Sequence, residues 1–188
     1  MLFRSLISRP YTLKFPKEPS PPFEKFRGAP RFTEEKCVGC TACAQVCPAK
    51  AIEVKDDKAT ATRTLTVRHD TCIYCGQCQA NCLTFEGIKL TTEYDLAAYK
   101  REEVIDSVEK KLLLCSDCGE IIAPEDQLIW VAKRVGSAAF SNPTLYLSYL
   151  KSLNLSYPEL AEPVENIWRA DRMKVLCTSC RRRTTLNT

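Results

Sequence analysis

The sequence lacks the residue sets from which many enzymes build a reactive site. Its 188 residues include one histidine, His69, and contain no Ser/His/Asp set, carboxylate dyad or phosphate-binding loop. General acid–base, nucleophilic and nucleotide chemistry therefore have no recognisable starting point. We expect no catalytic or substrate site in this chain alone.

Long apolar runs are also missing. No stretch approaches the roughly 20 residues that a membrane-spanning helix needs. The opening "MLFRSLISRPYT" carries Arg4 and Arg9, which leaves no apolar region for a secretory signal. Residues 1–9 are amphipathic at helical spacing, which predicts either a terminal flap or a foot on a partner subunit or membrane surface. Six prolines in residues 10–31 predict an extended arm lying over a surface.

Isolated cysteines are absent too, although cysteine itself is abundant. The chain has twelve, and each lies two or three residues from another. Cysteines so close together are poorly placed to crosslink distant parts of a fold, as a disulfide scaffold requires. The spacing therefore favours metal ligation in a reducing cytoplasm.

Two matching stretches hold eight of these cysteines. Residues 37–48 read "CVGCTACAQVCP" and residues 72–83 read "CIYCGQCQANCL". In such a run three cysteines wrap one [4Fe–4S] cluster and the fourth reaches the other cluster. The predicted ligand sets are Cys37, Cys40, Cys43 and Cys82 for cluster 1, and Cys72, Cys75, Cys78 and Cys47 for cluster 2. Cys82 is followed by Leu83 where Pro48 follows Cys47, so the turn beside Cys82 is the less certain one.

The repeat sets the expected organisation, an α+β fold with a 2[4Fe–4S] ferredoxin-like core. We expect an N-terminal foot and arm at 1–31, the ferredoxin domain at 32–92, a connecting helix at 93–113 and a helical extension at 114–188. Within the core, "IEVKDDKATATRTLTV" predicts two short strands around a turn at Asp56-Asp57. Within the extension, helices are predicted at 124–135, 143–154 and 164–172.

The core resembles the two-cluster ferredoxin-like subunit of respiratory complex I and group 4 membrane-bound [NiFe]-hydrogenases. The resemblance covers residues 24–91, including "FRGAPRF", "CVGCTACAQVCPAKAI" and "HDTCIYCGQCQANC", and the following "KLTTEYDLAAYKREEV" is similar to that family's next helix. The cysteine pairs of the tail resemble the formate hydrogenlyase iron–sulfur subunit more than the complex I one. The resemblance implies an electron-transfer subunit on the cytoplasmic side of a membrane complex.

The last four cysteines form two similar knuckles, "LLCSDCGEII" and "VLCTSCRRRT". Two C-x2-C pairs can supply a tetrahedral four-thiolate site, here Cys115, Cys118, Cys177 and Cys180. Zinc is the preferred occupant and would clasp the ends of the helical extension. A rubredoxin-like iron remains an alternative, as do free thiols.

Charge gives no support for nucleic-acid binding. The formal net charge is +4 with neutral cysteines, but two oxidised clusters and one divalent ion on twelve thiolates would bring it to about −2. Arg181, Arg182 and Arg183 are expected to form a solvated or docking tail. His69 is expected to make a hydrogen bond near cluster 2 or to be exposed, with a ligand role left open.

The sequence therefore predicts a subunit that relays single electrons through two [4Fe–4S] clusters. The donor or acceptor would be another iron–sulfur subunit or ferredoxin, and the catalytic module would be a formate hydrogenlyase-like hydrogenase or, alternatively, a complex I-like NADH or ferredoxin:quinone oxidoreductase. Two other classes stay open: a nucleic-acid-associated protein with structural clusters, and a soluble module serving a flavin or radical enzyme.

Overall fold

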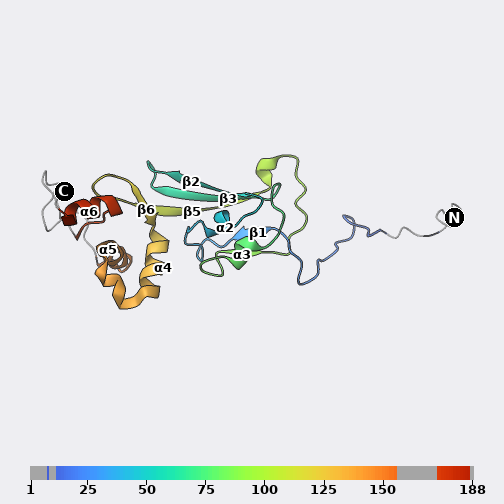
Figure 1. Cartoon of the computed structure of the whole chain (residues 1–188). Helices are drawn as coiled ribbons and strands as arrows, with labels where there is room; N and C mark the ends of the chain where they lie inside the picture. Colours follow the sequence, from blue (N-terminus) through green and yellow to red (C-terminus); the bar gives the residue numbers. More distant parts are fainter. Residues whose placement is uncertain (1–7, 9–11, 156–172, 187–188) are drawn as a thin grey trace.

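The computed structural model describes residues 8, 12–155 and 173–186 (Figure 1). Two antiparallel sheets carry the first part of the chain. A two-stranded sheet pairs β1 (Pro30–Phe32) with β4 (Ile88–Leu90), and a four-stranded sheet has the order β2 (Ile52–Asp57), β3 (Thr62–Arg68), β5 (Ile105–Leu114), β6 (Ile121–Pro124). Two single-turn helices connect strands of the two sheets. Helix α2 (Ala42–Gln45) lies between β1 and β2 in the sequence, and α3 (Gln77–Ala80) lies between β3 and β4. The protein thus contains both α-helices and β-strands, as predicted.

The core lies on one face of the four-stranded sheet. Leu65 and Val67 alternate along β3 and are almost fully buried, with Ile88 of β4 packed in the same cluster. This period of two is what a half-buried strand requires. Three of the cysteines, Cys37, Cys43 and Cys78, belong to the same buried cluster. The sheet thus supplies an apolar floor beneath the cysteine loops.

The hairpin β2–β3 confirms the two strands predicted in the core, but its turn comes later than expected. Asp56 still pairs with Arg63 across the ladder, and the turn follows Asp57. The Asp57 carboxylate accepts hydrogen bonds from the Ala59 backbone N–H and the Thr60 hydroxyl, each at 2.8 Å. Aspartate often starts a turn in this way, with its side chain bonding the backbone two residues on.

The prediction of a connecting helix at 93–113 is wrong. Apart from the short 3₁₀ turn η1 (Arg101–Glu103), the regular structure there is the strand β5, which pairs with β3 along its length. Val108 and Leu112 fit both a helical and an alternating pattern, so they do not distinguish the two. The residue between them that faces inward is Lys110. Because this inward position holds a charged residue, the sequence does not show the alternation of apolar and polar residues that is typical of a strand.

The extension after β6 is helical in its described part. It contains α4 (Glu125–Val135), the 3₁₀ segment η2 (Gly136–Ser141), α5 (Pro143–Ser152) and α6 (Thr178–Leu186). The first two α-helices match the predictions at 124–135 and 143–154, and Pro143 occupies the first turn of α5 as proline favours. The helix predicted at 164–172 and all of the amphipathic segment 1–9 except Ser8 lie outside the described residues.

Figure 1 shows α6 at one end of the molecule and the N-terminal arm extending from the other, with the cysteine-bearing loops between them. The described part of the arm is anchored on Tyr94, whose hydroxyl donates to the Ser20 carbonyl at 2.7 Å and whose ring packs against Phe15 and Phe26. Within the described residues no helix has the length and apolar character needed to cross a bilayer.

Candidate iron–sulfur and metal sites

The two cysteine repeats have the same backbone conformation. Positive φ angles occur at matching positions: Gly39 and Tyr74 two residues after the first cysteine, and Thr41 and Gly76 just before each short helix. Left-handed residues at these points turn the chain so that it wraps around a common centre. The repeat seen in the sequence is therefore also a repeat of structure.

The match continues past the fourth cysteine of each run. Lys50 and Phe85, each three residues after that cysteine, both have positive φ. Their backbone N–H groups donate to the carbonyls of Cys47 and Cys82 at 3.2 and 3.1 Å. The turn beside Cys82 thus keeps the form of the turn beside Cys47, although Leu83 stands where the first repeat has Pro48.

Two cavities lie beneath these loops, and each is lined by four cysteines from both repeats. The first is lined by Cys37, Cys40, Cys43 and Cys82. The second is lined by Cys47, Cys72, Cys75 and Cys78. The fold therefore brings together the same two groups of four that the sequence predicted as ligand sets, and all eight cysteines are free of disulfides.

The cavity walls combine cysteine thiols with apolar side chains. Burial raises the pKa of the Cys43 thiol to about 12 and that of Cys78 to about 11, so both are protonated at neutral pH without a cation nearby. Ligation by thiolate would displace these protons. Apolar side chains fill the rest of the walls, for example Leu65 in the first cavity and Val67 in the second. Four sulfurs converging in an apolar cavity are what a [4Fe–4S] cube requires.

Backbone N–H groups point at the sulfurs in both loops. The Tyr74 N–H donates to Cys72 Sγ at 3.4 Å, and the Gly39 N–H makes the equivalent bond to Cys37. Such bonds stabilise negative charge on the sulfurs, and they belong to the features that set a cluster's reduction potential.

The fourth cysteines differ in their surroundings. The described bond to Cys47 Sγ comes from the Ala51 N–H, at 3.3 Å. Burial raises the pKa of Cys82, but bonds from the Thr84 hydroxyl and from the backbone of Thr84, Ile88 and Gly87 outweigh it, and the net effect is a lowered pKa. Thr84 lies in the stretch before "GIKL" that is one residue longer than its counterpart in the first repeat. Sequence reasoning did not identify Thr84.

The tail cysteines come together at the far end of the sheet. Cys115 and Cys118 follow β5, while Cys177 precedes α6 and Cys180 lies within it. Their four sulfurs lie within 4.8 Å of one another, and Cys118 Sγ is 3.6 Å from Cys177 Sγ. A tetrahedral ion with bonds of about 2.3 Å separates its sulfur ligands by about 3.8 Å. The arrangement therefore fits a single metal ion.

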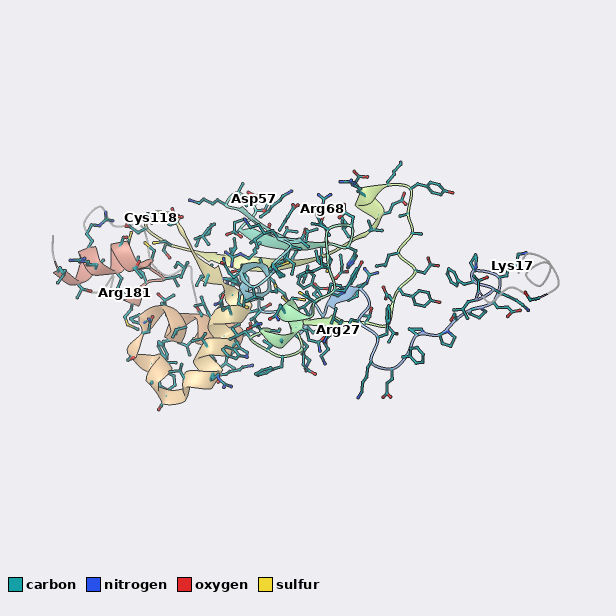
Figure 2. The ribbon with its side chains drawn as sticks, turned by 45° about the vertical axis from the view of Figure 1, so that its right-hand side comes forward. Lys17, Arg27, Asp57, Arg68, Cys118 and Arg181 are labelled. Atoms are coloured by element: carbon teal, nitrogen blue, oxygen red, sulfur yellow. The ribbon has the colours of Figure 1, made fainter. Side chains whose placement is uncertain are left out.

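The surroundings of the tail site shift its thiols in different directions, since the pKa of Cys115 is lowered while hydrogen bonds within the site raise the pKa values of Cys118 and Cys180. Burial raises the pKa of Cys115, but N–H donors from Cys118, Cys177 and Asp117 outweigh it and bring the value down to about 6. Arg183 bonds Asp117 and approaches Cys180 Sγ at 3.9 Å. Figure 2 shows Cys118 and Arg181 at the same end of the molecule.

Two weaker predictions need correction. His69 is buried, and neither ring nitrogen has a hydrogen-bond partner among the described residues, so the expected hydrogen bond or exposure is wrong for its side chain. Arg181 is not part of a solvated tail: its guanidinium donates to the Thr144 hydroxyl and the Lys174 carbonyl, each at 2.8 Å. Arg182 and Arg183 are exposed, as expected.

Comparison with known proteins agrees with this geometry. Residues 36–85 match the family described as "4Fe-4S dicluster domain". The chain is 34% identical over 118 residues to NADH-quinone oxidoreductase subunit I 2 of Geobacter metallireducens, covering 58% of this chain and 88% of that protein. This chain belongs to the subunit I family of two-cluster iron–sulfur proteins. The matched segment 36–85 contains all eight core cysteines of this chain.

Two further relatives are similar to this chain over a smaller share of their own length. NAD(P)H-quinone oxidoreductase subunit I of Gloeobacter violaceus is 32% identical over 109 residues, which cover 55% of this chain and 52% of that protein. Formate hydrogenlyase subunit 6 of Escherichia coli is 34% identical over 119 residues, which cover 62% of this chain and 64% of that protein. The chain therefore spans about half to two thirds of the length of these two relatives.

Proposed function

We propose that this chain is an electron-transfer subunit that carries two [4Fe–4S] clusters and has no catalytic site of its own. The observation that supports this most is the pair of cavities, each lined by four cysteines drawn from both repeats. Cys37, Cys40, Cys43 and Cys82 would hold cluster 1, and Cys72, Cys75, Cys78 and Cys47 would hold cluster 2. Bound clusters would supply one-electron chemistry. The chain's part is to hold them close together and shield them from water.

The crossed sets follow from how the two runs face each other. Helices α2 and α3 pack against one another, and each run's fourth cysteine lines the cavity of the opposite loop. The two clusters would then share walls built from the same short segments. That arrangement suits the stepwise passage of single electrons.

We propose further that the subunit works within a membrane-bound hydrogenase of the formate hydrogenlyase type, on the cytoplasmic side and peripheral to the membrane. Support comes from the relative named formate hydrogenlyase subunit 6 and from the tail cysteine pairs. The second candidate is a complex I-like quinone oxidoreductase, which the names of two relatives favour. In either assembly the partners would be an iron–sulfur donor or acceptor and the catalytic module.

We assign the tail site to structural Zn²⁺, with a rubredoxin-like iron as the alternative. Zinc commonly occupies sites made of two C-x2-C pairs, and four thiolates close its coordination. The ion would fasten the β5–β6 turn to α6 and so fix the ends of the extension. A site of this kind needs no redox chemistry.

Two measurements test the proposal. EPR of the anaerobically purified, dithionite-reduced chain should show two spin-coupled [4Fe–4S] signals, and absence of such a pair would overturn the relay function. An affinity-tagged chain, purified from its native membranes, should bring with it either hydrogenase subunits or quinone-oxidoreductase subunits, which decides between the two assemblies. Salt-sensitive binding to duplex DNA or RNA without such partners would support the nucleic-acid alternative instead.

A further inference from the structure

Lys110 is a buried cation beside the first cysteine loop. Its side chain is 8% exposed, and it comes from the inward face of β5. The ammonium group donates to the Glu34 carbonyl at 2.5 Å and to the Asp126 carboxylate of α4 at 3.0 Å. Lysine is almost never this deeply buried unless it is paired. The Glu34 carbonyl and the Asp126 carboxylate supply that pairing, so Lys110 is a buried cation held at a fixed place.

The lysine stem touches the loop that wraps cluster 1. A Cβ atom added to Gly39 would lie 3.2 Å from both Cβ and Cγ of Lys110, so the stem packs directly against this loop. Glu34, whose carbonyl the ammonium group binds, lies three residues before Cys37. Lys110 thus lies against the loop that carries three predicted ligands of cluster 1.

The second loop has no glycine at the position of Gly39, where Tyr74 stands instead, and its one glycine, Gly76, matches Thr41. Beside Gly76 the nearest atom is the apolar Leu90 Cδ1, at 3.2 Å. The cation described there is Arg27, which is exposed and reaches the Cys75 carbonyl at 3.4 Å. Water screens an exposed charge far more than a buried one.

A second cation near the first loop is already neutralised. Arg63 donates to the Gly39 carbonyl at 3.0 Å, but its guanidinium makes two bonds of 2.7 Å to the Asp56 carboxylate. Asp126, by contrast, holds Lys110 through one oxygen and is half exposed. Lys110 is therefore the less compensated of the two cations.

We propose that Lys110 is a positioning residue that raises the reduction potential of cluster 1 above that of cluster 2, so that an electron in the pair rests on cluster 1. A nearby positive charge favours the more negative, reduced form of a cluster. Because Asp126 belongs to α4, the proposal also links that potential to the docking of the C-terminal extension. It rests on the proposed function, since it requires both clusters to be bound.

The test is redox potentiometry followed by EPR on Lys110→Met, with exposed Lys111→Met as the matched control. We expect Lys110→Met to shift the potential of one cluster to more negative values and to leave the other unchanged. Lys111→Met should shift neither. Equal shifts of both clusters, or none, would overturn the proposal.

Asp126→Asn keeps the test decisive if Lys110→Met perturbs the fold. This variant removes the compensating carboxylate and should shift the same cluster in the opposite direction, to more positive values. Structural damage has no reason to reverse sign with the charge removed, so shifts of the same sign in both variants would contradict the role of Lys110. Iron and sulfide analysis separates the two levels: wild-type chain without about eight irons would refute the proposed function itself.

Discussion

The core and the tail both gather cysteines four at a time, yet they arrange them differently. In the core the cysteines of both repeats line two cavities, whereas in the tail four sulfurs lie within 4.8 Å of one another. The ligand type is the same in both places. The C-x2-C spacing is also shared. What differs is the backbone around it: left-handed turns and apolar walls open a cavity in the core, and two facing knuckles close around a point in the tail.

The crossed arrangement in the core can be tested by pairing substitutions. Cys47→Ser with Cys72→Ser removes two ligands from one predicted set, so about half of the cubane iron should remain. Cys47→Ser with Cys37→Ser removes one ligand from each set, and nearly all of the iron should be lost. Iron analysis and EPR of the two double variants would measure this. The reverse ranking would mean that each run serves one cluster on its own.

The tail should behave independently of the core. Cys115→Ser with Cys177→Ser should remove one metal ion per chain and leave the cubane iron in place, because the two kinds of site share no ligand. Metal analysis that counts zinc and iron separately checks this. Iron loss from the core in this variant, with the tail ion retained, would contradict the assignment of ligands to the two regions.

A smaller difference is expected between the two cysteine loops of the core, in the stability lost when a glycine of each loop is replaced by alanine. Gly39 and Gly76 both have positive φ, so alanine at either position should cost about 1–2 kcal/mol in the free energy of unfolding. At Gly39 the new methyl group also meets Pro124 and Lys110 at 3.1–3.2 Å, whereas at Gly76 it meets the flexible end of Leu90. Gly39→Ala should therefore destabilise more, as measured by denaturant unfolding of the holoprotein. Equal losses would show that the extension does not press on the first loop.

The parts of this structure that could be predicted from sequence are those that depend on residues close together in the chain. The grouping of the eight core cysteines follows from C-x2-C-x2-C-x3-C, and the start of α5 follows from Pro143. The strand β5 could not be recognised, because Lys110 occupies an inward position that a hydrophobic pattern would give to an apolar residue. Its partners Glu34 and Asp126 are distant in sequence, so nothing local signals its burial. The donors around Cys82 were missed for a related reason, since they depend on how the chain turns back through Thr84.

Strand β5 fixes the positions of Lys110 and Cys115 relative to each other, so it should be sensitive to insertions. This strand carries Lys110 beside the first loop and delivers Cys115 to the tail site. Because side chains alternate between the two faces of a strand, inserting one residue between Val108 and Leu112, before the register shift at Leu113/Leu114, would turn one of these inward side chains to the wrong face. Gene variants should therefore tolerate added residues in the β2–β3 turn at 58–61 far better than single additions within β5. Within β5, therefore, only an insertion of an even number of residues would keep the inward side chains on their present face.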